Sequence, residues 1–205
     1  MITASVLDIL SSMVPALQGA VAQGVLWGIM VLGVYITFRL LDIADLTVDG
    51  SFALGGCVCA VLVVKYNVNP VLALLVATIA GLLAGAITGI LHTVFEIPAI
   101  LAGILTQIAL WSINLRVMGG KSNMPLLKVK TLISSVVDMT GLTQSQASLI
   151  VGIVVAILMI VLLYWFFGTE IGSALRATGN NEDMIRALGV NTKMTKLLAL
   201  MISNG

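Results

Sequence analysis

The chain has 205 residues, of which 60% are hydrophobic and 9% are charged, and its formal net charge is +1. About a quarter of the residues of a water-soluble domain are charged, so this composition excludes an ordinary soluble fold. The near-neutral charge gives no sign of a nucleic-acid-binding surface.

Apolar segments follow one another along the chain and predict membrane helices. About twenty consecutive apolar residues are enough to cross the hydrocarbon core of a bilayer. Four segments reach that length, namely residues 20–38, 71–91, 97–115 and 147–167. Residues 50–64 are apolar but shorter, so we expect a broken or tilted span there. A further segment opens at Leu197, and we expect residues 1–205 to be one transmembrane domain that is cut within its sixth span.

These segments predict an all-α fold, a polytopic transmembrane helix bundle. Backbone polar groups inside lipid must be satisfied internally, which leaves helices or closed barrels. Barrel strands alternate in polarity over about ten residues, whereas these segments are apolar on every face. Small residues spaced by four mark helix faces that another helix can approach closely. Such faces are predicted at Gly81, Gly85 and Gly89, and at Gly24 and Gly28.

Basic residues do not decide the orientation of this bundle. With residues 168–196 placed in the cytoplasm and five single crossings, five basic residues lie on each side. The cytoplasmic set is Arg39, Arg176, Arg186, Lys193 and Lys196, and the outer set is Lys65, Arg116, Lys121, Lys128 and Lys130. The positive-inside rule therefore favours neither orientation.

Few residues suggest a metal, nucleotide or catalytic site. His92 and Glu96 lie four apart, but no third ligand is evident, and the turn before Pro98 explains them as well. The run Gly119–Ser122 reads GGKS but lacks the earlier glycine of a phosphate-binding loop. With a single histidine, no catalytic set can be assembled. We expect no bound metal or cofactor, and no enzyme activity in this chain.

The stretch "RLLDIADLTVDGSFALGG" places Asp42, Asp45 and Asp49 in or beside membrane-level sequence. Carboxylates inside a membrane are costly and usually face a cavity or a pore. The alternative is a hydrated loop between two spans, with the next helix beginning near Gly50. The residue types favour neither reading. The candidate translocation-path residues are Asp45, Thr47, Asp49 and Ser51.

Residues 173–196 form an unusually polar segment, with four basic and two acidic residues. Gly179 and the pair Asn180–Asn181 predict a turn. Asn181 can cap a helix, and Glu182 with Asp183 suits the positive end of its dipole. We therefore expect a short helix outside the membrane.

This short helix is predicted to be amphipathic. Met184, Ala187 and Leu188 fall at positions i, i+3 and i+4 and form one apolar stripe. Gly189 is a predicted helix stop. The stripe needs a cover, which is either lipid headgroups or a groove on a partner protein.

Two motifs resemble one known family. "GSALRATGNNEDMIRALGVN" resembles the cytoplasmic coupling loop of ABC-importer permeases of the branched-chain amino acid and simple-sugar class. The matching residues are Ala177, Gly179, Asn181, Glu182, Arg186, Gly189 and Val190. "ADLTVDGSFALGG" looks like the Asp-Leu-Ser-Val-Gly-Ser motif of the same class, with Asp49 as an extra residue. The combination looks closest to the amino-acid branch, which includes permeases assigned to tryptophan-type substrates.

The resemblance implies a permease subunit of an ATP-driven importer in the bacterial cytoplasmic (inner) membrane. ATP and Mg would be bound by a separate ATPase subunit docked on the coupling helix. Further implied partners are a second permease chain, forming a homodimer, and an extracytoplasmic substrate-binding protein. The implied coupling residues are Gly179, Asn181, Glu182, Asp183, Met184, Arg186, Ala187, Leu188 and Gly189.

Two other functions remain open from the residues alone. An ion-coupled secondary transporter or channel would use carboxylates of the Asp42–Asp49 loop for coupling. A membrane scaffold that transports nothing would leave the short cytoplasmic helix without a moving partner.

Overall fold

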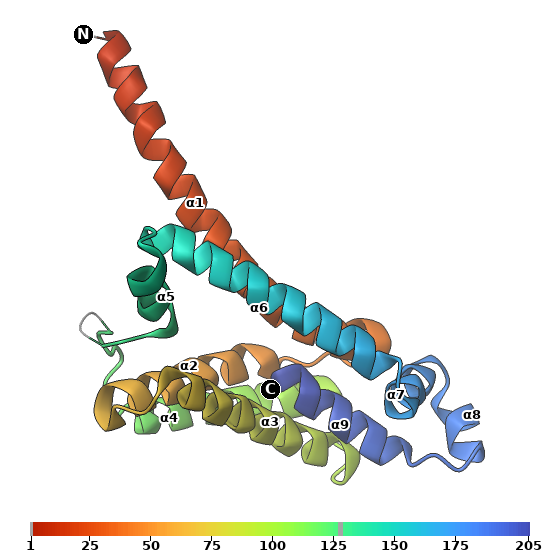
Figure 1. Ribbon diagram of the computed structural model, residues 1–205. Coiled ribbons are helices and arrows are strands. Elements are labelled where there is room, and N and C mark those ends of the chain that lie inside the picture. Colours follow the sequence, from red (N-terminus) through yellow and green to blue (C-terminus); the bar gives the residue numbers. More distant parts are fainter. Residues whose placement is uncertain (1, 127–128) are drawn as a thin grey trace. The chain divides into compact units, whose positions relative to one another are not determined.

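The computed structural model describes the backbone of residues 2–126 and 129–205. Side chains are described for Met13, for residues 16–126 and for residues 129–205. Figure 1 shows that the described part of the chain is helical and has no strand.

Within the described residues, five helices are long and apolar enough to cross a membrane, which confirms the all-α, multi-pass prediction. They are α1 (Ile2–Tyr35, continued by the π-helical turn η1, Ile36–Leu40), α2 (Thr47–Tyr66), α3 (Pro70–Thr93), α4 (Ala99–Val117) and α6 (Gln144–Phe167). The shorter helices are α5 (Leu132–Thr140), α7 (Glu170–Asn180), α8 (Glu182–Ala187) and α9 (Thr192–Asn204).

Of the broken or tilted span expected at residues 50–64, the break is wrong, because α2 is a continuous helix of 20 residues. The helix extends beyond the apolar run at both ends. Thr47 and Ser51 belong to its start, where burial and hydrogen bonds hold polar side chains.

The chain divides into two compact units. The first contains residues 1–29 and 131–163. Within it, Gly152 of α6 packs against Val25 and Leu26 of α1, where a Cβ atom would lie 3.3 Å from Val25 Cγ1. Thr131 and Ser134 form a capping box that begins α5.

The second unit contains residues 30–130 and 164–205, with α2, α3, α4 and α9 packed together (Figure 1). Leu54, Ala84 and Leu110 form an apolar cluster among α2, α3 and α4. A second cluster joins Leu41 and Ile43 to Leu175, Ala199 and Leu200, and so ties the loop before α2 to α7 and α9. Lys65 lies in the last turn of α2, and Arg116 lies in the last turn of α4. Lys128 is outside the described residues.

The small-residue face of α3 is confirmed as a helix-packing surface. A Cβ at Gly81 or Gly85 would collide with backbone of α9, at Asn204 and Leu200, and one at Gly89 would meet Leu197. These glycines therefore let α9 lie directly on α3. At Gly24 and Gly28, where the sequence predicts a similar face, no described atom lies within 4 Å of either added Cβ. No close helix contact is therefore seen there among the described residues.

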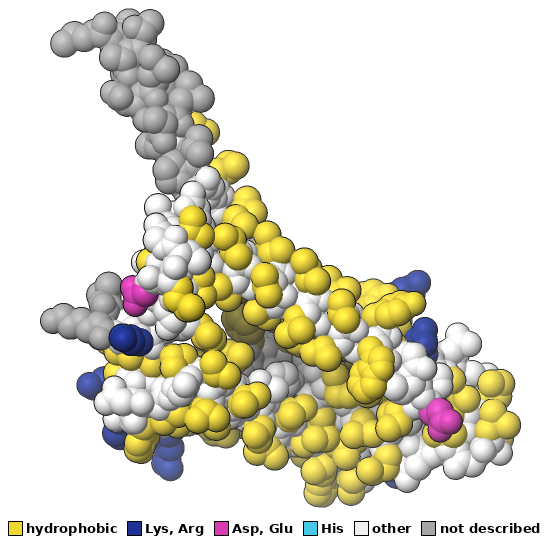
Figure 2. All heavy atoms as spheres, in the orientation of Figure 1, with side chains coloured by type: hydrophobic (Ala, Val, Ile, Leu, Met, Phe, Trp, Pro, Cys, Tyr) yellow, Lys and Arg dark blue, Asp and Glu magenta, His cyan; other side chains and the backbone are white. Residues whose placement is uncertain are grey.

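Large apolar side chains cover the outer faces of the helices, as Figure 2 shows, with charged side chains gathered near helix ends. On α3 alone, Ile79, Leu83 and Ile87 are each at least half exposed. Water-soluble proteins rarely expose apolar surface on this scale, whereas lipid accommodates it. The surface therefore agrees with a protein that crosses the membrane several times.

Candidate functional site

The predicted short helix exists as α8, Glu182–Ala187, within the polar segment. Asn181 is its N-cap, and the side-chain oxygen of Asn181 accepts a hydrogen bond from the Met184 backbone N–H at 3.0 Å. Glu182 and Asp183 occupy the first turn, where negative charge complements the helix dipole. Gly189 follows the helix with φ of +88°, a conformation that suits glycine. The cap and the stop are thus confirmed.

The predicted turn at Gly179–Asn181 is wrong in its extent. Helix α7 continues through Asn180, and Asn181 alone is extended, with φ −155° and ψ 97°. Gly179 serves a different purpose, because a Cβ there would overlap the Leu40 carbonyl group and lie 2.8 Å from Leu41 Cα. Its missing side chain lets α7 rest against the end of η1.

The apolar stripe of α8 is uncovered in this chain. Met184 is 54% exposed and Leu188 is 70% exposed, and Ala187 beside them is also exposed. Ile185 points the other way and is only 6% exposed. The sequence prediction missed Ile185, although an apolar residue off the stripe already indicated a second contact face. One face of α8 is therefore anchored and the other is free.

Charged side chains fasten α8 to the start of α9. Glu182 pairs with Lys196 at 2.6 Å and with Arg186 at 3.1 Å, and Arg186 also donates to Thr192 Oγ1 at 3.3 Å. The hydrogen bond from Lys196 holds the pKa of the Glu182 carboxyl below its usual range, against a smaller opposing effect of desolvation. Lys196, Arg186 and Thr192 all favour its charged form.

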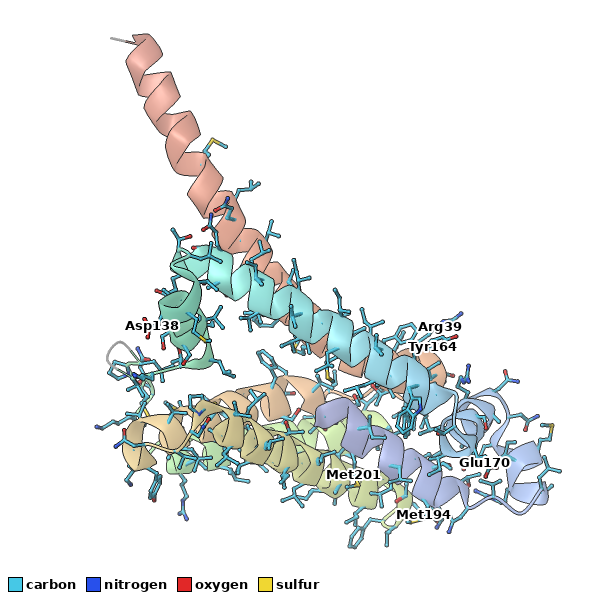
Figure 3. All side chains as sticks on the ribbon, in the orientation of Figure 1. Arg39, Asp138, Tyr164, Glu170, Met194 and Met201 are labelled. Carbon is cyan, nitrogen blue, oxygen red and sulfur yellow. The ribbon has the colours of Figure 1, made fainter. Side chains whose placement is uncertain are left out.

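A pocket of about 560 Å³ lies at the connection from α8 to α9 and includes Glu96, Arg186, Gly189 and Lys193 in its lining. Two of these lining residues, Lys193 and Glu96, pair at 3.4 Å. A second pocket, of about 490 Å³, lies between the loop before α2 and the α7–α9 end, and includes Asp42, His92 and Lys196. Figure 3 labels Met194 on α9 and Glu170 on α7 at the same end of the unit, and Met194 is 51% exposed.

His92 and Glu96 do not form a metal site with other described residues. His92 Nδ1 lies 2.9 Å from the Ile97 carbonyl oxygen, and Glu96 pairs with Lys193. Glu96 adopts φ of +58° in the turn that ends before Pro98. No group of three potential ligands is found in the described residues. These contacts fit the structural turn that the sequence offered as the alternative.

The Asp42–Asp49 stretch is only partly a loop, because α2 already begins at Thr47. The hydrated-loop reading is wrong for Asp45 and Thr47, which are buried. Ser51 lies near the start of α2, where that reading also placed it, and is buried as well. Asp45 Oδ1 accepts from the Thr47 backbone N–H at 2.8 Å, and Asp45 Oδ2 accepts from Asn204 Nδ2 at 2.7 Å. Ser51 Oγ donates to Asn204 Oδ1 at 2.7 Å. The buried carboxylate therefore has a partner on each oxygen, as burial of a charge requires.

Asp49 is separated from this network. It is exposed, and Gln107 Nε2 of α4 donates to Asp49 Oδ2 at 3.2 Å. Thr47 instead turns toward α3, where its Oγ1 lies 2.8 Å from Thr88 Oγ1. The structure thus splits the four candidate path residues into three buried ones and one exposed one. Gln107, Thr88 and Asn204 were not predicted, because their partners are 58, 41 and 159 residues away in the sequence.

Comparison with known proteins identifies the family. Residues 16–204 match the family model described as "Branched-chain amino acid transport system / permease component". A "Tyrosine transport system permease protein" from Clostridioides difficile is 39% identical over 183 residues, 89% of this chain and 58% of the relative. An uncharacterized protein from Rickettsia prowazekii is 33% identical over 186 residues, 91% of this chain and 62% of the relative.

The chain thus spans about three fifths of the length of these two relatives. No solved structure matches it. The family match covers all five span-length helices from Ala16 onward and the whole polar segment. The chain belongs to the family of permease components of branched-chain amino acid transport systems.

Proposed function

We propose that this chain is the membrane-spanning permease subunit of an ATP-driven ABC importer. It moves an amino acid or a similar small solute into the cell by alternating access. Family membership and the amino-acid transport name of the C. difficile relative support this assignment. The chain itself hydrolyses nothing, and ATP with Mg is held by a separate ATPase subunit.

The exposed stripe of α8 is the observation that carries the proposal. A six-residue helix is marginal by itself in water, yet α8 is capped by Asn181 and fastened to α9 through Glu182. Met184 and Leu188 project from this fixed helix without a cover. An apolar projection of this kind fits a groove on a partner protein. Because the Glu182–Lys196 ion pair fixes α8 to α9, a partner protein that binds α8 can transmit force to the permease. Contact with lipid headgroups alone would not require such a fixed helix.

The proposed assembly follows from this contact between α8 and a partner protein. The ATPase subunit binds α8 through the coupling residues Gly179, Asn181, Glu182, Asp183, Met184, Arg186, Ala187, Leu188 and Gly189. A second copy of the permease completes the transmembrane path, and an extracytoplasmic substrate-binding protein delivers the solute. The assembly sits in the bacterial cytoplasmic (inner) membrane, with α8 on the cytoplasmic side.

The translocation path is assigned to the face of α2 that bears Asp49. An exposed carboxylate on a membrane helix is costly against lipid, and it tends to face a water-filled cavity. Gln107 holds Asp49 from the neighbouring helix α4. In this arrangement Asp45, Thr47 and Ser51 support the path from behind, since their side chains are buried.

The test is uptake of a labelled amino-acid mixture, tyrosine included. It uses right-side-out vesicles or proteoliposomes that carry the full-length protein with its ATPase and substrate-binding protein. Uptake that needs ATP on the α8 side and survives ionophores supports the proposal. Uptake that proceeds without ATP and stops when ion gradients collapse overturns it. That second result assigns the protein to ion-coupled transport through Asp42, Asp45 or Asp49.

A further inference from the structure

Helix α9 touches both parts of the candidate site. Its first turns meet α8, and its last residues meet the start of α2. From Lys196 to Asn204 the helix advances eight residues, which is about 12 Å at 1.5 Å per residue. One helix therefore joins the coupling helix α8 to α2, the helix that bears Asp49.

The contacts at the α8 end are charged. Lys196 reaches Glu182 at 2.6 Å, and Thr192 accepts from Arg186 at 3.3 Å. The Lys196 side chain is only 20% exposed, so its ion pair with Glu182 is less weakened by water than an ordinary surface pair. A displacement of α8 consequently acts on α9.

The contacts at the other end centre on one amide. Asn204 is 8% exposed, donates to Asp45 Oδ2 and accepts from Ser51 Oγ, both at 2.7 Å. It also donates to the Leu200 carbonyl oxygen at 2.9 Å. Among the described residues, Asn204 is thus the side chain that bonds α9 to both Asp45 and the first turns of α2. Hydrogen bonds to a charged group are stronger than neutral ones.

Helix α9 also lies close against α3. Gly81 and Gly85 of α3 face the backbone of Asn204 and Leu200, and Gly89 faces Leu197. Small residues at such positions let two helices approach closely. Helix α9 therefore lies directly on α3 along the length that joins Lys196 to Asn204.

We propose that Asn204 is a positioning residue that transmits movement of the coupling helix to the translocation path. When the ATPase moves α8, Lys196 moves α9, and Asn204 carries that displacement to Asp45 and the first turn of α2. The inference rests on the proposed function. It adds the residue through which movement of the ATPase subunit reaches the translocation path.

The experiment uses the full-length permease with its ATPase and binding protein in proteoliposomes. ATP hydrolysis and uptake of the labelled amino-acid mixture are measured on the same preparation. Asn204→Leu removes the amide while keeping a similar volume. The matched control is Ser203→Ala, because Ser203 is equally buried but bonds to the Gly33 carbonyl oxygen and not to α2.

The expected result is uncoupling in one variant only. In Asn204→Leu, solute moved per ATP falls by about tenfold or more, the scale of losing hydrogen bonds to a charged group, while hydrolysis continues. Ser203→Ala keeps the wild-type ratio. Exchanging the two groups, with Asp45→Asn and Asn204→Asp together, restores the ratio to within about threefold, because the exchanged side chains can still bond to each other, to Thr47 and to Ser51. The bond to the Leu200 carbonyl oxygen is lost, but it lies within α9 and does not join α9 to α2.

The exchange keeps the test decisive if Asn204→Leu does not fold. Asn204→Asp alone sets a second carboxylate against Asp45 and is expected to be uncoupled. A folded exchange variant that stays as uncoupled as this single variant overturns the proposal, and so does a wild-type ratio in Asn204→Leu. Failure of the proposed function shows differently, because wild-type protein itself would then take up solute without ATP. In that case this inference falls with it.

Discussion

Replacement of Gly85 by alanine tests whether α9 packs directly against the face of α3 that bears Gly81, Gly85 and Gly89. A Cβ at this position would overlap the Leu200 carbonyl oxygen and lie 2.8 Å from the Leu200 carbonyl carbon and 2.9 Å from Met201 Cα. All three are backbone atoms of α9, so no flexible side chain can move aside. Ordinary contact begins at 3.4 Å, and the helices must separate by at least the difference between 3.4 and 2.8 Å, which is 0.6 Å.

The cost follows from two opposing effects. Inserting a methyl group into a closely packed contact typically costs about 1–3 kcal/mol. Alanine in a helix is favoured over glycine by about 1 kcal/mol. Gly56→Ala in α2 measures the second effect alone, because nothing lies within 4 Å of a Cβ there. Gly85→Ala should therefore be less stable than Gly56→Ala by about 1–3 kcal/mol.

Thermal unfolding of the full-length protein in mild detergent, followed by circular dichroism, provides the assay. A loss of 1 kcal/mol lowers the midpoint by roughly 2–4 °C for a chain of about 150–250 residues and by less for a longer chain. Gly85→Ala is therefore expected to melt about 1 °C or more below Gly56→Ala. Equal midpoints for the two variants would refute the close approach of α9 to α3.

Four further predictions concern the α8 end and the path. Gly179→Ala should destabilise the fold by about 1–3 kcal/mol in the same melting assay, because α7 must move away from η1. Asp49→Asn should lower uptake of the labelled mixture while leaving the melting midpoint unchanged, since Asp49 is exposed. Arg186→Glu should lower uptake per ATP, because it removes one partner of Glu182 and places a like charge four residues away. The lowered pKa of Glu182 means that its pairing with Lys196 stabilises the protein above the ordinary glutamate pKa of about 4.3 and is lost as pH falls through the lowered value, so wild type and Glu182→Gln should differ in melting midpoint near neutral pH and converge in strong acid.

The membrane helices could be predicted because each is a long apolar run, and length and polarity decide whether a segment crosses lipid. The limits of α2 could not, because Thr47 and Ser51 are polar residues. They are buried in the helix only because Thr88 and Asn204 meet them from other helices. The packing face of α3 was readable from its glycine spacing, whereas the same spacing at Gly24 and Gly28 has no described neighbour.

Local chemistry also predicted the start of α8, because an asparagine followed by acidic residues caps a helix through its own neighbours. Gly179 was misread as a turn residue, since its role depends on Leu40, which is distant in the sequence. The exposed stripe was found from periodicity, while Ile185 was missed as the anchor. The Asp45–Asn204 bond joins residues 159 positions apart, and no local pattern predicts such a pair.

The most direct measurement is a pull-down of the full-length tagged protein in mild detergent, with mass spectrometry of the proteins that accompany it. The comparison is with a variant in which Met184, Arg186 and Leu188 are replaced by serine and which keeps the wild-type melting midpoint. The account predicts that an ATPase subunit accompanies the wild-type protein and is lost from the variant. Recovery of the permease without any ATPase, together with uptake driven by an ion gradient, would contradict it.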